Sequence, residues 1–438
     1  MKVYKKLMSN NSDYKKGNNN PKVFYGLPKE IKFCNNCTYN NQKPNSEIEF
    51  KHNIKTKKPI IDFNKNEVCD ACNRGLEKQS INWKSRENEL LELCNKYRKK
   101  DGSYDCLVPG SGGKDSFFAA HILKYKYKMN PLTVTWAPHI YTEWGWKNFQ
   151  SWISAGFDNY LFTPSTLTHR LLTRLALENL FHPFQPFMLG QMLFPPKIAM
   201  KLKIPLIFYG ENPDEYGNKK NKIDSPKKDI KFFSKEKSDD FFISGLNRKQ
   251  LLEYGVSDND LIAYKPINKD EVSKNNINVQ YLGYYLRWHP QENYYYTIEN
   301  SNFTPSPERT PGTYSKYSSI DDKLDDLHYY TTYIKFGMGR ATYDSAQEIR
   351  NGEINREEGV ELVRKFDGEY PIRFENELFE YLSIDIKNFP KASRKLKNPI
   401  MTKEYFDKLT EKFRSPHLWY YSSSEKKWKL RKTVFNNN

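Results

Sequence analysis

The chain has 438 residues and a formal net charge of +17, from 70 lysines and arginines against 53 aspartates and glutamates. This length predicts two or three domains with enough chain to bury a core, and an aromatic content of 15% excludes a wholly disordered chain. No apolar run approaches the roughly 18–20 residues that span a bilayer, and none follows the charged N-terminal residues as in a secretory signal. A cytoplasmic protein with no membrane partner is therefore expected.

The excess of lysine permits an anionic partner but does not identify one. Lysine and asparagine are abundant throughout the chain, and lysine-rich runs such as 219–222 and 227–237 are typical of solvated loops. Nucleic acid is not expected as a partner.

Four of the six cysteines form two CxxC pairs, Cys34 with Cys37 and Cys69 with Cys72. Two such turns at this separation are typical of a zinc ribbon, in which four thiolates surround Zn²⁺ tetrahedrally. Four thiolates leave no open coordination position, so the predicted role is structural. A pair of redox dithiols and iron–sulfur ligation are the alternatives. Cys94 and Cys106 are predicted to face the core, and no cysteine follows Cys106.

In chain order, a polar extension at 1–30, poorly ordered or draped over the surface, precedes the cysteine module at 31–78. A helix at Ile81–Lys99 then opens an α/β region at 79–217 in which strands and helices alternate. Its strands are expected at Tyr104–Val108, Leu132–Trp136, Tyr160–Phe162 and Pro205–Tyr209, and helices at Ser116–Tyr127, Trp146–Ala155 and two later stretches. The alternation predicts a doubly wound parallel sheet.

The composition changes after this region. Residues 218–276 are lysine-rich and are predicted to form an irregular insertion or a mobile lid. Residues 277–438 are rich in aromatics and predicted to be mainly helical, with helices at Ser345–Arg350, Arg356–Phe366 and Lys403–Phe413. This last region is expected to contact the substrate or a partner.

The strongest motif is PGSGGKDS, Pro109–Ser116, between a predicted strand and a predicted helix. Backbone N–H groups of such a glycine-rich turn converge on an anion, and the helix N-terminus adds positive charge. A Walker A loop requires Ser or Thr after the lysine, but Asp115 follows Lys114; a dinucleotide GxGxxG also fails, because Asp115 occupies its third glycine position.

The loop resembles the SGGxDS loop of the PP-loop ATP pyrophosphatases. That resemblance implies a fold of this type and cleavage of ATP between its α- and β-phosphates, with Mg²⁺. The implied catalytic residues are Lys114, Asp115 and Glu211. The implied ATP-binding residues are Gly110, Ser111, Gly112, Gly113, Lys114, Asp115, Ser116, Trp136 and Gly210.

Two branches of this superfamily differ in the nucleophile. Transfer-RNA thiolases of the two-thiouridine type also combine CxxC pairs with an SGGKDS loop, but sulfur transfer usually needs cysteines downstream of the loop. A built-in glutaminase would need a nucleophilic cysteine at the mature N-terminus or in a glycine-flanked elbow, and residue 2 is lysine. Ammonia from a separate glutaminase subunit, or free ammonium, is therefore predicted, with tRNA thiolation as the alternative.

Several further blocks resemble the bacterial N-acetyl sugar amidotransferases, over roughly residues 31–370. They include LTVTWAPHIYTEWGWKNFQSWISAGFDNYLFTP, FHPFQPFMLGQ, FYGENPDEYGN and FGMGRATYDSAQEIRNGEINREEGVELVRKFDGEYP. The resemblance implies conversion of an acetamido to an acetamidino group on a sugar, for surface polysaccharide or for pseudaminic or legionaminic acid on flagellin, with a partner glutaminase. Candidate substrate residues are His139, Trp144, Trp146, Gln185, Gln191 and Arg340.

The sequence departs from that family in its extended N-terminus, in residues 219–240 and in the tail after about 390. A non-enzymatic alternative is a zinc-ribbon nucleic-acid binder with a degenerate ATPase fold. The intact GGKDS sequence argues against it.

Overall fold

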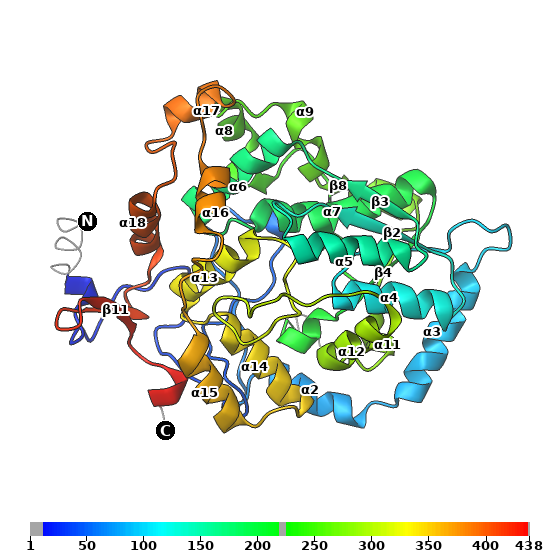
Figure 1. The fold of residues 1–438 in the computed structure, drawn as a ribbon, viewed down its shortest axis with the longest axis horizontal. Coiled ribbons are helices and arrows are strands. Elements are labelled where there is room, and N and C mark those ends of the chain that lie inside the picture. Colours follow the sequence, from blue (N-terminus) through cyan, green and yellow to red (C-terminus); the bar gives the residue numbers. More distant parts are fainter. Residues whose placement is uncertain (1–11, 219–224, 437–438) are drawn as a thin grey trace.

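The computed structural model describes residues 12–218 and 225–436. The structure contains a five-stranded sheet with the order β3-β2-β1-β4-β9, in which every neighbouring pair is parallel. The sheet lies in the right half of the view in Figure 1. The strands are β1 Cys106–Pro109, β2 Pro131–Trp136, β3 Asn159–Phe162, β4 Leu206–Tyr209 and β9 Asn278–Tyr281. The predicted α/β architecture with a parallel sheet is confirmed, and β9 is an additional strand that the sequence pattern did not reveal.

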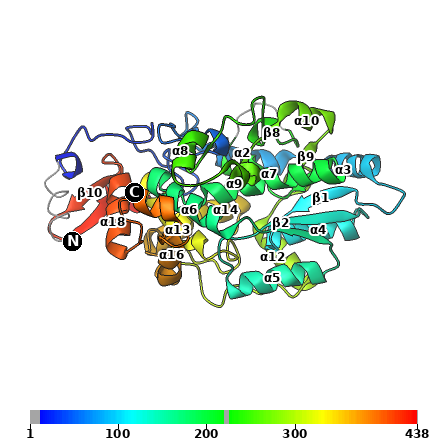
Figure 2. The ribbon, with the colours of Figure 1, turned by 90° about the horizontal axis from the view of Figure 1, so that it is seen from above.

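Helices cover both faces of the sheet (Figure 2). Side chains alternate along a strand, so Leu107 of β1 joins one hydrophobic core and its neighbour Cys106 joins the other. The first core includes α7 (Gln185–Leu202), and the second includes α4 (Lys114–Tyr125) and α5 (Glu143–Ser154). Cys106 therefore faces a core, as predicted.

The strand order places the expected ligand crevice at β1. The chain runs outward from β1 through β2 to β3, and then returns to add β4 on the other side of β1. In open α/β sheets, ligands bind outside the carboxyl ends of the strands where the order reverses. Here that position lies beyond β1 and β4.

The lysine-rich segment is folded where it is described. Residues 225–276 contain short elements and bury Phe233, Ile243, Leu251 and Tyr264 in the first core. These elements are β5 Ser234–Lys235, β6 Phe242–Ile243, β7 Leu246–Asn247, α8 Arg248–Glu253, α9 Asp258–Leu261, β8 Ile267–Asn268 and α10 Lys269–Lys274. Residues 225–276 are therefore not irregular, because apolar residues spaced among the lysines anchor them in the core; their role as an insertion or lid stays a prediction. The run 219–222 lies outside the described residues.

The C-terminal region is mainly helical, as predicted. Its elements are α11 Leu282–Tyr285, α12 Pro290–Asn300, α13 Leu324–Phe336, α14 Arg340–Asn351, α15 Arg356–Phe366, α16 Glu375–Leu382, α17 Pro390–Lys395, α18 Lys403–Phe413 and the hairpin of β10 Trp419–Ser422 with β11 Lys427–Leu430. Three further helices precede this region: α2 Asp70–Ser80, α3 Trp83–Tyr97 and α6 Thr166–Leu180. Within 12–218 and 225–436, no helix has both the length and the apolar character needed to cross a membrane.

The described part of the N-terminal extension lies against the end of the chain, where blue and red segments meet in Figure 1. The Tyr14 hydroxyl donates to the Arg414 carbonyl at 3.0 Å, and the backbone N–H of Phe24 donates to Ser415 Oγ at 2.9 Å. Residues 12–30 are thus draped over the surface, whereas residues 1–11 are not described.

Candidate active site

A cavity of about 440 Å³ opens beyond the carboxyl ends of β1 and β4. We call it the loop cavity, because the glycine-rich turn between β1 and α4 forms one wall and a distant segment, 317–347, forms the opposite wall. Its lining consists of Gly110, Ser111, Gly113, Lys114, Asp115, Ser116, Asn148, Glu211, Tyr216, Tyr317, Ser318, Ser319, Ile320, Asp321, Tyr329, Arg340, Tyr343, Asp344 and Gln347. The cavity therefore occupies the crevice that the strand order predicts.

Two positions of the turn must be glycine because neighbouring atoms leave no room for a Cβ. A Cβ on Gly110 would lie 2.1 Å from the Cβ of Ser116, and a Cβ on Gly112 would lie 2.7 Å from the carbonyl oxygen of Asn148. Gly112 also has a φ of +89°, which other residues rarely adopt. Helix α4 starts directly after Gly113, so its first N–H groups have no intrahelical acceptor and the positive end of its dipole faces the turn. This geometry suits an anion such as a phosphate.

Acidic groups and a lysine lie side by side at the turn. The Lys114 ammonium pairs with the carboxylate of Asp115, which also accepts a hydrogen bond from Asn293 Nδ2 at 3.3 Å. Glu211 follows β4 and accepts a hydrogen bond from the Tyr216 hydroxyl at 2.6 Å. Burial and the negative charge of Asp115 raise the pKa of Glu211 to about 7, although Lys114 acts in the opposite direction. Glu211 can therefore gain or lose a proton near neutral pH.

The opposite wall contributes a cation and two further carboxylates. Arg340 donates from Nε to both oxygens of Asp344 at 3.0 and 3.1 Å, and its guanidinium lies 4.1 Å from the centre of the Tyr329 ring. Its buried Nη1 has no hydrogen-bond partner. Burial raises the pKa of Asp321, and a hydrogen bond from Ser111 opposes this effect. The opposite wall thus offers Arg340 Nη1, a buried N–H donor without a partner, across the cavity from the glycine-rich turn.

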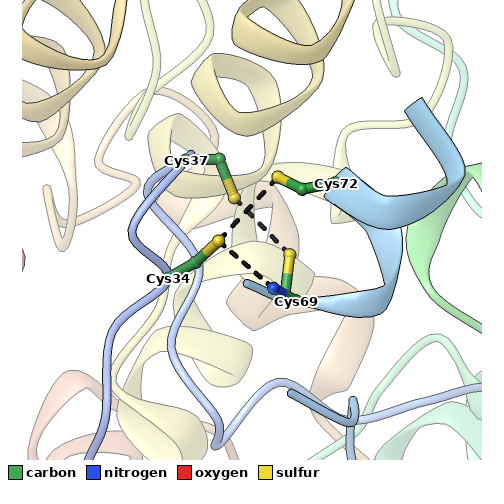
Figure 3. Close-up of side chains that lie close together, drawn as sticks. All are labelled: Cys34, Cys37, Cys69 and Cys72. Atoms are coloured by element: carbon green, nitrogen blue, oxygen red, sulfur yellow. Dashed lines mark hydrogen bonds between the residues drawn. The ribbon is translucent and has the colours of Figure 1, made fainter. Parts of the chain in front are cut away.

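The four CxxC cysteines form a second, separate cluster (Figure 3). Cys34 and Cys37 lie in a loop, and Cys69 and Cys72 lie at the start of α2; all four are buried and their sulfurs lie within 4.8 Å of one another. The Sγ atoms of Cys34 and Cys72 are 3.8 Å apart, and those of Cys37 and Cys69 are 3.7 Å apart. Tetrahedral zinc with Zn–S bonds of about 2.3 Å requires sulfur separations of about 3.8 Å. The cluster fits zinc.

The surroundings of the cysteines link them to the loop cavity. Ala346 of α14 packs in the same core cluster as the cysteines, and Thr38 Oγ1 donates to the carbonyl of Thr342 at 3.0 Å. Helix α14 also carries Arg340 and Asp344 of the cavity wall. Burial would lower the pKa of Arg350, but the negative charges of Tyr39 and of the thiolates outweigh it and raise the pKa, so a cationic Arg350 would offset the charge of a four-thiolate zinc site. Burial lowers the pKa of Lys43 to about 7, although the thiolates oppose this effect. The cluster therefore supports one wall of the cavity.

The structure brings one group of the predicted site residues together and leaves another apart. Around the loop cavity lie Gly110, Ser111, Gly113, Lys114, Asp115, Ser116, Glu211 and Arg340, with Gly112 directly behind the turn against Asn148. Gly210 precedes Glu211 and is covered by Trp288, and its carbonyl accepts a hydrogen bond from Gly283. The functional roles of all these residues stay predictions.

Six other candidates do not contribute to the lining found for this cavity among the described residues, and Trp136 is one of them. It is buried in the core, where its ring lies against Gly190 and contacts Tyr264 edge-on. His139 is buried with Nδ1 2.7 Å from the Asp322 carboxylate.

Gln185 is also used inside the fold, since its Nε2 donates to the carbonyl of Glu49 and its Oε1 accepts from the N–H of Ser244. Gln191 and Trp146 are exposed.

A sixth candidate, Trp144, also lies outside that lining. It is half-buried, and its ring is 5.4 Å from the Arg373 guanidinium. This tryptophan therefore packs against a cation of the C-terminal region.

Sequence reasoning did not identify several residues of the cavity lining, notably Tyr216, Tyr317, Asp321, Asp344 and Gln347. Most of them come from 317–347, about two hundred residues after the turn, and no local pattern connects the two segments. One signal was present: Arg340 and Asp344 are spaced as a helical i,i+4 ion pair.

Comparison with known proteins gives a partial assignment. Residues 311–434 match the family described as the C-terminal domain of WbpG-like LPS biosynthesis proteins. This match supports a polysaccharide-biosynthesis family and a biosynthetic enzyme. About half of the loop-cavity lining comes from the matched region.

A stretch of 83 residues, 19% of this chain, is 40% identical to an uncharacterized protein of Methanocaldococcus jannaschii. The chain spans only 29% of the length of that relative.

Proposed function

We propose that this chain is an ATP-dependent amidotransferase that adenylates the acetamido group of an N-acetylated sugar and replaces its oxygen with nitrogen from ammonia. The observation that carries the proposal is the loop cavity. It joins a phosphate-type turn to acidic side chains and an arginine, and half of its wall comes from a region similar to an LPS biosynthesis domain.

The turn and α4 would hold the phosphates of ATP. The glycines allow the backbone to approach closely, Lys114 supplies a cation, and Arg340 has an unused donor for a phosphate or carboxylate oxygen. Asp115 and Asp321 offer carboxylate oxygens of the kind that Mg²⁺ prefers. Bound Mg²⁺ would neutralise phosphate charge during the transfer.

The proposed chemistry has two steps. The acetamido oxygen attacks the α-phosphorus, the bond between the α- and β-phosphates breaks, pyrophosphate leaves and the amide N–H proton is released. Ammonia then adds to the former carbonyl carbon, AMP leaves with the oxygen, and an acetamidino group remains. An amide is a poor electrophile, so the cavity must align the two reactants and stabilise charge.

Glu211 is suited to act in the second step. Its pKa of about 7 lets it accept a proton from nitrogen as ammonia adds, and return it near neutral pH. The lining of the loop cavity contains no cysteine among the described residues, which favours nitrogen over sulfur as the nucleophile. A separate glutaminase subunit is the proposed source of ammonia, and zinc at the four cysteines is proposed to be structural.

The experiment is a product assay with ATP, ammonium and a panel of acetamido sugars, both nucleotide-linked and nonulosonic. The expected result is AMP, pyrophosphate and a sugar about one mass unit lighter, with all three lost in Asp115→Asn. A matched Asp101→Asn variant, changed in an exposed loop, should retain activity. AMP formation that depends on tRNA, or no AMP with any acetamido sugar, would contradict the proposal.

A further inference from the structure

A second cavity of about 260 Å³ adjoins the loop cavity. We call it the side chamber; it lies between residues 44–58, the start of α7 and helix α13. Tyr329 of α13 and Tyr343 of α14 line both cavities, so these two side chains form a shared wall. At the other end, Ser46 is exposed, so the chamber opens to solvent beside the cysteine module.

The chamber contains two buried side-chain atoms without a hydrogen-bond partner. Glu49 is 4% exposed and its Oε2 has no hydrogen-bond partner; the closest cationic candidate is His52, with Nδ1 at 3.7 Å. His328 Nδ1 is also buried without a partner. Both atoms are acceptors when His328 carries its proton on Nε2, and a small donor of several N–H bonds would then suit the chamber.

The electrostatics of the chamber favour a neutral amine at its inner end. Burial lowers the pKa of His328 to about 3 and that of Lys335 to about 7. The same loss of solvation disfavours ammonium relative to ammonia. Burial would raise the pKa of Glu49, but the nearby His52 imidazole and the charge of Lys58 outweigh it and lower the pKa, so Glu49 stays anionic.

The remaining charged groups of the chamber compensate one another. Lys58 pairs with Glu47 at 2.7 Å and lies 3.2 Å from His52 Nδ1, while Lys335 donates to the carbonyl of Leu180 at 2.8 Å. Glu49 is therefore the carboxylate in this described chamber with an oxygen left for a ligand.

We propose that the side chamber binds ammonium at Glu49 and His328 and passes ammonia between Tyr329 and Tyr343 into the loop cavity. Bound ammonium releases one proton to water at the open end, Glu49 stays anionic throughout, and neutral ammonia moves on. This inference rests on the proposed function, because it supplies the nucleophile of that reaction.

The test uses the full chain with ammonium chloride as the nitrogen source, and compares Glu49→Gln and Thr332→Phe with wild type. The first variant removes the charge that holds ammonium, and the second places a larger side chain in the chamber. A matched Glu30→Gln variant changes an exposed residue near the cysteine module. Two readouts are needed: the KM for ammonium, and sugar-dependent exchange of pyrophosphate into ATP without ammonium, which reports adenylation alone.

Both chamber variants should raise the KM for ammonium about tenfold or more, since a hydrogen bond to a charged group is lost or access is narrowed. Pyrophosphate exchange and the control variant should stay at the wild-type level. An unchanged KM for ammonium, or loss of exchange in parallel with turnover, would overturn the inference. Absence of exchange in wild type would instead overturn the proposed function and the inference with it.

Discussion

Replacing Glu211 with glutamine is expected to stabilise the folded chain while it abolishes turnover. Burial and the charge of Asp115 raise the pKa of Glu211 from its ordinary value of 4.5 to about 7. At 1.36 kcal/mol per pKa unit, ionising this group in the folded state costs about 3 kcal/mol. Glutamine carries no such cost, and its side-chain oxygen can still accept the hydrogen bond from Tyr216.

The stabilisation of the folded chain by Glu211→Gln must increase as the pH rises. Below pH 4.5 Glu211 is protonated in both states and contributes nothing. Between pH 4.5 and 7 the unfolded chain releases this proton while the folded chain retains it, so wild type loses stability as the pH rises. Above pH 7 the full cost applies, and the advantage of the variant is greatest.

The assay is thermal unfolding without ligands at pH 5 and pH 8.5. An unfolding entropy of about 2.1 cal/mol/K per residue converts 3 kcal/mol into about 3 °C for a chain of this size that unfolds together. The melting temperature of Glu211→Gln should exceed that of wild type by about this amount at pH 8.5 and by much less at pH 5. Glu299→Gln, at an exposed position of α12, should give no pH-dependent difference. A variant less stable than wild type at pH 8.5, or an equal gap at both values, would refute the reasoning.

Three further changes have defined outcomes. Gly112→Ala should abolish ATP turnover and lower the melting temperature, since a φ of +89° costs about 1–2 kcal/mol for other residues and the new Cβ meets Asn148; wild-type turnover would contradict the role of the turn. Cys69→Ser should remove the one zinc ion per chain expected by elemental analysis and lower both stability and activity; no zinc in reduced wild type would refute the metal site. Gln185→Ala should lower the melting temperature without changing the KM for sugar, because its amide bonds the Ser244 backbone inside the fold; a raised KM alone would show substrate contact.

The sequence predicts the parts of the fold that have regular apolar patterns. Strands β1, β2 and β4 are short, almost wholly apolar runs, and α15 and α18 have the predicted bounds. Strand β9 has the sequence NVQY, and its two amide side chains interrupt the apolar pattern that would predict a buried strand. Gln280 can be buried there because the Tyr285 hydroxyl donates to its side-chain oxygen and its Nε2 donates to Asn278 Oδ1. A tertiary contact of this kind leaves no local pattern.

The candidate site also has one part that the sequence predicts and another part that it does not. The turn with Lys114 and Asp115 is a contiguous motif, and its place between strand and helix follows from the sequence. The wall with Asp321 and Asp344 comes from a distant segment, so only folding brings it to the turn. His139 comes from a family-like block, but its side chain bonds the buried Asp322 and lies outside the lining of the loop cavity, so its role in substrate binding stays a prediction.

The central claim is that the acetamido oxygen becomes bonded to the α-phosphorus of ATP. The most direct measurement supplies the substrate with oxygen-18 in its acetamido carbonyl and analyses all phosphorus products by mass spectrometry. The account predicts one oxygen-18 atom in AMP, none in pyrophosphate and none in the acetamidino product. Oxygen-18 in inorganic phosphate with formation of ADP, or its retention in the sugar, would contradict the account.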